Sequence, residues 1–66
     1  MNCNKLKGKL VECGVTYEKA AIAIGVKTGT FSNKINGKAR FYIEELEKLG
    51  DLLGLTRDER ADLFLS

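Results

Sequence analysis

The side chains best suited to specific recognition lie in the segment 27–36, where short polar residues surround two apolar ones. Phe31 and Ile35 are four residues apart, so on a helix they share one face, which we expect to be buried. The opposite face carries hydrogen-bonding groups and a basic edge: Lys27, Thr28, Gly29, Ser32, Asn33 and Asn36, with Lys34 at its margin. These groups suit recognition through hydrogen bonds.

Side chains of these types match the edges of base pairs in the major groove of DNA. A hydroxyl can donate to or accept from a base edge, a Thr methyl suits the thymine methyl, and an Asn amide can bond adenine in bidentate fashion. We therefore expect Thr28, Ser32 and Asn33 to contact bases. The alternative is that these three are ordinary solvated residues of a helix surface.

Basic and hydroxyl-bearing residues flank this segment and suit contacts with DNA phosphates. Many protein–DNA hydrogen bonds go to the phosphate backbone, from Lys, Arg, Tyr and Thr side chains and from helix N-termini. The expected backbone contacts are Thr16, Tyr17, Lys27, Lys34, Lys38 and Arg40. Lys5, Lys7 and Lys9 alternate along the chain, so at least one of them should point away from the DNA.

Charge is unevenly distributed along the 66 residues. Residues 1–40 carry eight basic and two acidic side chains, a net charge of +6, whereas residues 41–66 carry three basic and seven acidic ones, a net charge of −4. This asymmetry suggests that the first 40 residues face a polyanion and that the rest face water or a protein. Ordinary solvated faces are the other interpretation.

Glycines mark the boundaries of the elements that must position these residues, since the sequence has seven glycines and no proline. Four of them follow a stretch with helical spacing and suit the left-handed residue just past a helix end: Gly14, Gly25, Gly37 and Gly54. They predict five helices at about 4–13, 17–24, 27–36, 41–53 and 57–65. The short connections leave no room for a sheet, so the predicted fold class is all-α, a compact bundle of about five short helices in one domain, 1–66.

Apolar spacing also predicts which faces are buried. We expect Ala20, Ala21 and Ile24 to point inward, and Thr56 to form a capping box with Glu59. The predicted stripe on the fourth helix is broad: Ile43, Leu46, Leu49, Leu52 and Leu53. Three glycines fall inside helices, where close approach of another backbone is the expected reason: Gly8, Gly29 and Gly50.

Residues 16–37 form the most informative motif, TYEKAAIAIGVKTGTFSNKING. Two short helices meet at a tight turn at Gly25 and Val26, and the small Ala21 lets them approach closely. The pattern resembles the helix-turn-helix of phage Cro and repressor proteins, the lambda-repressor-like (XRE-type) family. The likeness extends from Leu6 to about Leu55, and the chain is similar to small prophage regulators of Gram-positive bacteria. The resemblance implies a transcriptional regulator that docks the segment 27–36 in the major groove.

Three positions depart from that family pattern. Tyr17 stands where the family often has a Gln that bonds a phosphate, and a Tyr hydroxyl can do likewise. Lys27 occupies the usual Ser or Thr cap of the recognition helix, so Thr28 is an alternative cap that shifts the helix start by one residue. Gly29 sits where a base-reading side chain often lies, which weakens any detailed sequence code.

Other function classes find less support in the sequence. The chain has no His, no metal-ligand cluster and no nucleophile beside a base, so we expect no enzyme, no metal, no cofactor and no small-molecule ligand. Cys3 and Cys13 are expected to be reduced thiols. No secretion signal or membrane span is expected either, so the expected compartment is the cytoplasm.

Two further functions remain open on the same scaffold. One is a protein-interaction module, supported by Ile22, which falls away from the buried side of its helix. The other is an antitoxin or accessory phage factor. A DNA-binding regulator is expected to act on double-stranded operator DNA as a homodimer. Leu63, Phe64 and Leu65 are the candidate dimer surface, although two of the three could instead close the core of the monomer.

Overall fold

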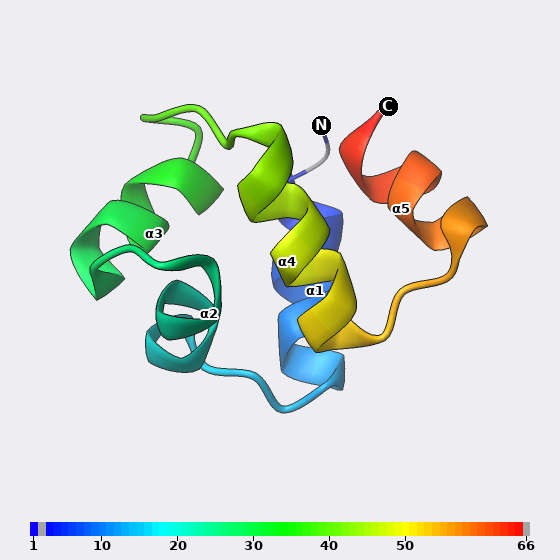
Figure 1. Cartoon of the computed structure of the whole chain (residues 1–66), viewed down its shortest axis with the longest axis horizontal. Coiled ribbons are helices and arrows are strands. Elements are labelled where there is room, and N and C mark those ends of the chain that lie inside the picture. Colours follow the sequence, from blue (N-terminus) through cyan, green and yellow to red (C-terminus); the bar gives the residue numbers. More distant parts are fainter. Residues whose placement is uncertain (2, 66) are drawn as a thin grey trace.

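The computed structural model describes residues 1 and 3–65, and these form five α-helices without a strand. The helices are α1 (Cys3–Glu12), α2 (Tyr17–Ile24), α3 (Thr28–Ile35), α4 (Ile43–Leu53) and α5 (Arg57–Phe64) (Figure 1). The predicted all-α class and the number of helices are confirmed. Over this part of the chain, no helix combines the length and the apolar character needed to cross a bilayer.

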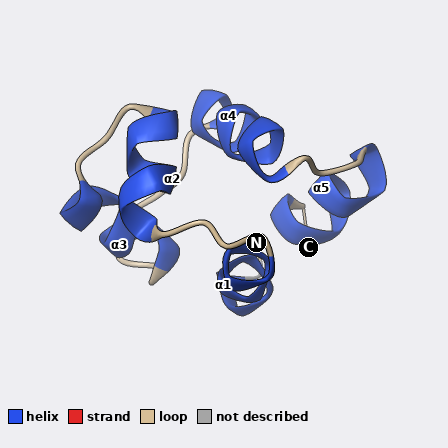
Figure 2. Cartoon of the chain, turned by 90° about the horizontal axis from the view of Figure 1, so that it is seen from below, coloured by secondary structure: helices blue, strands red, loops and turns tan. Residues whose placement is uncertain are grey.

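The two ends of the molecule are formed by different helices. α2 and α3 lie at one end and α5 at the other, with α1 and α4 between them (Figures 1 and 2). The molecule measures 28 × 22 × 20 Å along its principal axes. α2 packs against both α3 and α4, and α1 contacts α3 and α5. α3 thus lies at one end of the molecule, in contact with α2 and α1.

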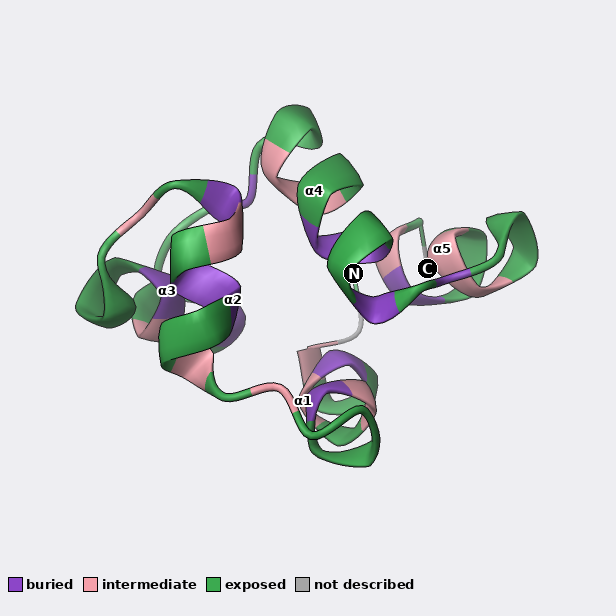
Figure 3. Cartoon of the chain, turned by 60° about the horizontal axis from the view of Figure 1, so that its bottom comes forward, coloured by how far each residue is buried: buried purple, intermediate pink, exposed green. Residues whose placement is uncertain are grey.

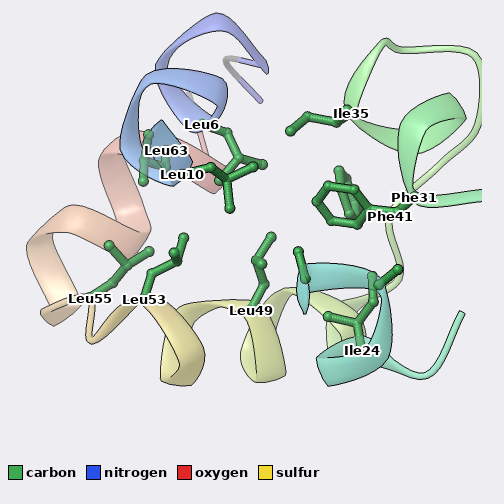
Figure 4. Packing of buried hydrophobic residues seen from close by; sticks show 12 residues of the cluster. Leu6, Leu10, Ile24, Phe31, Ile35, Phe41, Leu49, Leu53, Leu55 and Leu63 are labelled. Carbon is green, nitrogen blue, oxygen red and sulfur yellow. The ribbon is translucent and has the colours of Figure 1, made fainter. Parts of the chain in front are cut away.

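The core draws side chains from all five helices toward one centre (Figure 4). Phe31 of α3 is fully buried, and its ring meets those of Tyr17 and Phe41 edge to face, with centroids 5.4 and 5.9 Å apart. Burying a side chain of this size stabilises the fold by about 1.5–3 kcal/mol. The other large side chains that are fully buried are Leu6, Leu10, Ile35 and Leu49. The predicted inward positions Ala20, Ala21 and Ile24 are confirmed.

The apolar stripe of α4 is narrower than the sequence predicts. Leu49 and Leu53 are buried and Leu46 is half-buried, but Leu52 is exposed and Ile43 is 73% exposed. Only one face of α4 meets the rest of the molecule. Leu52 falls to the side of that face, and Ile43 is the first residue of the helix, ahead of its packed turns.

The glycines fall into two groups. Those predicted to follow helix ends all have a positive φ, as expected: Gly14, Gly25, Gly37 and Gly54. The expectation of a close backbone at the helix-interior glycines is wrong. Nothing lies within 4 Å of the Cβ position at Gly8 or Gly29, and the atoms nearest to that position at Gly50 belong to the Arg60 side chain, at 2.9 Å.

α5 is held by its cap, by two apolar residues and by three ion pairs, one of which joins Arg60 to Asp51 of α4 at 2.8 Å. The predicted capping box is present, since Thr56 Oγ1 accepts from the Glu59 amide and Glu59 Oε1 from the Thr56 amide. Lys5 pairs with Asp62 and Lys9 with Glu59, each at 3.0 Å. At the end of the helix, Leu63 is buried and Phe64 is half-buried, whereas Leu65 is 84% exposed. Two of the three residues expected at a dimer surface thus close the core of the monomer.

Replacing Gly8 with Ala should stabilise the protein, because the position is helical and a methyl group fits there. We expect the free energy of unfolding to rise by about 0.5–1 kcal/mol, measured by urea denaturation. The matched control is Gly14→Ala, where φ is +67° and a side chain is strained. That variant should lose about 1 kcal/mol. A loss of stability at both positions would contradict this assignment.

Candidate nucleic-acid interface

The corner between α2 and α3 is built on Gly25. Its φ is +81°, and its amide donates to the Ile22 carbonyl at 3.2 Å while the Val26 amide donates to the Ala21 carbonyl at 2.9 Å. These two bonds close the end of α2 as a Schellman motif, which requires the left-handed residue that glycine adopts most easily. Ala21 is fully buried and Val26 packs against the core, so the corner is fixed by both backbone and packing.

α3 presents one face to solvent at the end of the molecule. Phe31 and Ile35 anchor its inner face. With 3.6 residues per turn, Gly29 and Asn33 occupy the middle of the outer face. The exposed residues on and beside this face are Thr28, Gly29, Thr30, Asn33 and Asn36. Figure 3 shows exposed stretches of the ribbon at this end of the molecule.

The three expected base-reading residues differ in how free their side chains are. Asn33 is exposed, and its side-chain amide makes no hydrogen bond to any other described residue. Thr28 is exposed at the first position of α3. Ser32 is half-buried, with Oγ 3.4 Å from the Asn36 amide nitrogen. Thr30 is a further exposed hydroxyl beside the outer face, and it was not among the predicted base contacts.

The start of α3 carries no side-chain cap. Lys27 occupies the N-cap position with φ −76° and ψ 155°, and it makes no capping hydrogen bond. The alternative that Thr28 caps the helix is therefore wrong, since Thr28 is already its first residue. The first amides of α3 are left without the oxygen partner that a Ser or Thr would supply, beside the exposed Lys27.

The flanking residues expected at phosphates lie around α2 and α3. Lys38 and Arg40 are exposed in the loop after α3, and the Lys38 amide donates to the Asn33 carbonyl at 2.8 Å. Thr16 is exposed and caps α2, where its hydroxyl oxygen accepts from the Lys19 amide at 3.2 Å. Tyr17 is half-buried because its ring packs against Phe31.

Lys34 does not belong to this set, although the sequence places it there. Its side chain is 6% exposed, and its ammonium group donates to Glu45 Oε1 and to the Arg40 carbonyl, both at 2.8 Å. It also lies 4.7 Å from the centre of the Tyr42 ring. Lys34 precedes the buried Ile35 on the side of α3 that faces α4, and its charge is paired with that of Glu45. The prediction that Lys34 contacts a phosphate is therefore wrong, because its ammonium group is buried and already bonded.

Ion pairs within the molecule neutralise part of the positive charge of residues 1–40. Three basic residues of the first 40 pair with acidic residues of the second part: Lys5 with Asp62, Lys9 with Glu59 and Lys34 with Glu45. Lys5 and Lys9 thus both face α5. The basic residues of the first 40 that form no ion pair with any described residue are Lys7, Lys19, Lys27, Lys38 and Arg40.

Lys7 is placed differently from its neighbours on α1. Its ammonium group donates to Asn36 Oδ1 at 2.7 Å, and Asn36 Nδ2 donates in turn to the Ser32 carbonyl at 2.8 Å. The Lys7 side chain of α1 therefore reaches the C-terminal end of α3. The spacing of residues within α1 could not indicate this contact. As predicted, the three alternating lysines do not share one direction.

No candidate metal-binding site is present among residues 1 and 3–65. No three or more Cys, Asp or Glu side chains are grouped so that they could hold an ion. Cys3 is half-buried and Cys13 is exposed, and both carry free thiols.

The pKa of Glu45 is lowered from its ordinary value. Burial opposes ionisation of this carboxyl group, but hydrogen bonds from Lys34 and from the Tyr42 amide, together with the charges of Lys34 and Lys48, outweigh burial. Glu45 thus remains a carboxylate that can hold the Lys34 ammonium group.

Comparison with known families identifies the segment around these helices. A family model described as a helix-turn-helix domain matches residues 11–63, which runs from the last turn of α1 into the last turn of α5. Comparisons with curated proteins and with solved structures gave no match.

Acid should destabilise the fold in part through Glu45. Since its pKa is lowered in the folded state, its contribution is fully present above about pH 5 and is lost as the pH falls through that lowered pKa. The measurement is the free energy of unfolding between neutral and acid pH, in wild type and in Glu45→Gln. We expect a shallower acid dependence in the variant, and superimposable slopes would show that Glu45 contributes nothing.

Proposed function

The chain belongs to the helix-turn-helix domain family, and on this premise we propose that it is a sequence-specific regulator of transcription that docks α3 in the major groove of double-stranded DNA. The observation that carries the proposal is the outer face of α3. This face is polar, exposed and anchored from behind by Phe31 and Ile35, and it ends in uncapped amides beside Lys27. Such a regulator acts in the cytoplasm of a bacterial or phage-infected cell.

In this proposal the base contacts come from few side chains. Asn33 at the middle of the outer face bonds adenine, Thr28 contacts bases at the start of the helix, and Ser32 contributes its hydroxyl. Gly29 adds no side chain, so it permits a close approach of α3 to the groove floor. The phosphate contacts come from the surrounding residues: Thr16, Tyr17, Lys27, Lys38 and Arg40.

We propose further that the regulator is a Cro-like phage or prophage repressor that binds its operator as a homodimer. Half-sites about 34 Å apart, one turn of DNA, would then each receive one copy of α3, and the bound dimer would block a promoter. An apolar groove of about 250 Å³ between α4 and α5 supports a dimer surface. Ile43 and Leu65 line this groove and are largely exposed.

A protein-interaction module or an antitoxin on the same scaffold is the second candidate. Ile22 favours it, because this residue is 72% exposed on α2 without packing on the core. Salt dependence separates the two functions, since DNA binding through phosphate contacts weakens steeply as salt releases counterions. Selection of bound duplexes from a random DNA pool, followed by binding at two salt concentrations, is the direct test. Salt-independent or absent retention would favour the interaction module.

Asn33→Ala should reduce affinity for the selected operator and leave random DNA nearly unaffected. Losing a bidentate base contact costs about 1–3 kcal/mol, whereas binding to random DNA depends mainly on phosphate contacts. Affinity for both duplexes is measured by fluorescence anisotropy.

Lys38→Ala provides the contrast, with Arg57→Ala as the control at the far end of the molecule. Lys38→Ala should weaken binding to both duplexes alike and reduce the slope of log affinity against log salt by about 0.9. Arg57 lies at the start of α5 and should leave the slope unchanged. Equal losses on both duplexes for Asn33→Ala would remove its base-reading role.

Ile43→Glu should disrupt the proposed dimer, because it places a charge in the apolar groove between α4 and α5. Ile43 is exposed in the monomer, so the fold should persist. Sedimentation equilibrium at micromolar concentration should show a weaker association for the variant, and its binding to a two-half-site duplex should lose cooperativity. Arg57→Ala serves again as the control. A wild-type protein that is monomeric both free and on each half-site would refute the dimer.

A further inference from the structure

The ammonium group of Lys34 is the meeting point of three elements. It bonds Glu45 of α4 and the Arg40 carbonyl of the connecting loop, and it lies over the Tyr42 ring. The side chains of Lys34 and Glu45 are 6% and 12% exposed, so both charges are largely withdrawn from water. Such a pair ties α3 to α4 through the loop between them.

One carboxylate oxygen of Glu45 accepts two hydrogen bonds, one from Lys34 and one from Tyr42. Oε1 accepts from the Lys34 ammonium at 2.8 Å and from the Tyr42 amide, at the N-cap of α4, at 2.9 Å. The carboxylate therefore fixes the start of α4 and orients the Lys34 ammonium group, which holds the Arg40 carbonyl.

The loop has little apolar packing to define its shape. Within residues 36–42, Phe41 alone is buried. A hollow of about 340 Å³ borders the loop, and its lining includes Gly37, Ala39 and Arg40 of the loop together with Lys34, Leu46 and Phe64. The loop is instead held by polar bonds: the Lys38 and Ala39 amides to the Asn33 carbonyl, and the Arg40 carbonyl to Lys34.

We propose that Lys34 and Glu45 are positioning residues that hold the basic loop, with Lys38 and Arg40, in the shape in which it meets the DNA backbone. The inference rests on the proposed function, because it states how that surface is shaped. A buried ion pair is a poor source of stability, since desolvation offsets much of its attraction. Holding a loop carbonyl is a geometric task that an apolar pair of the same volume cannot perform.

The sign of one variant separates this role from simple electrostatics. Glu45→Gln removes a negative charge near the basic loop, so long-range attraction alone predicts tighter DNA binding. Loss of positioning predicts weaker binding. The matched control is Glu59→Gln, which makes the same charge change in the Lys9–Glu59 pair between α1 and α5, away from α3 (Figure 1).

We expect Glu45→Gln to weaken operator binding about 3- to 10-fold, as measured by anisotropy. Its salt slope should fall although no positive charge has been removed, because Lys38 and Arg40 no longer meet phosphates together. Glu59→Gln should bind as well as wild type or slightly better. Circular dichroism and urea denaturation establish that each variant is folded at the temperature of the measurement.

Trypsin supplies a second measurement that does not depend on DNA. It cleaves after Lys38 and Arg40, so release of the loop in Glu45→Gln should speed cleavage there several-fold relative to cleavage after Lys19 on α2. Glu59→Gln should leave that ratio unchanged. If Glu45→Gln fails to fold, Lys34→Met combined with Glu45→Leu replaces the pair by apolar groups and still frees the Arg40 carbonyl.

Three results decide the proposal. Weaker binding, a smaller salt slope and faster loop cleavage support it. A Glu45→Gln protein that binds DNA like Glu59→Gln, or whose loop is cleaved no faster than in wild type, overturns it while leaving the DNA-binding function intact. A wild-type protein without salt-dependent DNA binding overturns the proposed function itself and, with it, the role of the loop at DNA.

Discussion

The burial of Phe31 is the contact on which the rest of the structure depends. An eight-residue helix is too short to persist alone in water, so α3 exists because Phe31 packs between Tyr17 and Phe41 and because Ile35 follows one turn later. The same packing decides which face of α3 remains outside. Stability and recognition are therefore coupled, since a change that loosens Phe31 also tilts the outer face.

Electrostatic pairing divides the basic residues into two groups with different tasks. Lys5 and Lys9 bind acidic residues of α5, which buries little apolar surface, and Lys34 binds Glu45. Pairs of the first kind contribute little to stability because solvent screens them, so α5 also depends on Leu63. The Lys and Arg residues of the first 40 that pair with no described acidic residue lie, apart from Lys7, on α2, at the start of α3 and in the loop after it. Internal pairing thus leaves positive charge mainly beside the proposed DNA surface.

Features that depend on neighbouring residues along the chain could be predicted from the sequence. The left-handed turns at glycines, the capping box of Thr56 and the buried pair Phe31 and Ile35 all follow from local spacing. Features that depend on distant partners could not. Lysine is normally exposed, and nothing local to Lys34 reveals an acceptor eleven residues away. The exposure of Ile43 likewise depends on where the other helices end.

The composition of the α3 face limits how selective one copy can be. Of the side chains proposed to read bases, Asn33 and Thr28 are exposed whereas Ser32 is half-buried, and a good base contact discriminates by about 1–3 kcal/mol. Two such contacts give roughly 2–6 kcal/mol, which only partly covers the 4–10 kcal/mol that separates specific from non-specific binding in typical regulators. Two half-sites double the discrimination that base contacts provide, and the doubled range covers the difference between specific and non-specific binding. The small set of side chains on α3 is thus the physical reason why the proposed regulator needs a second copy.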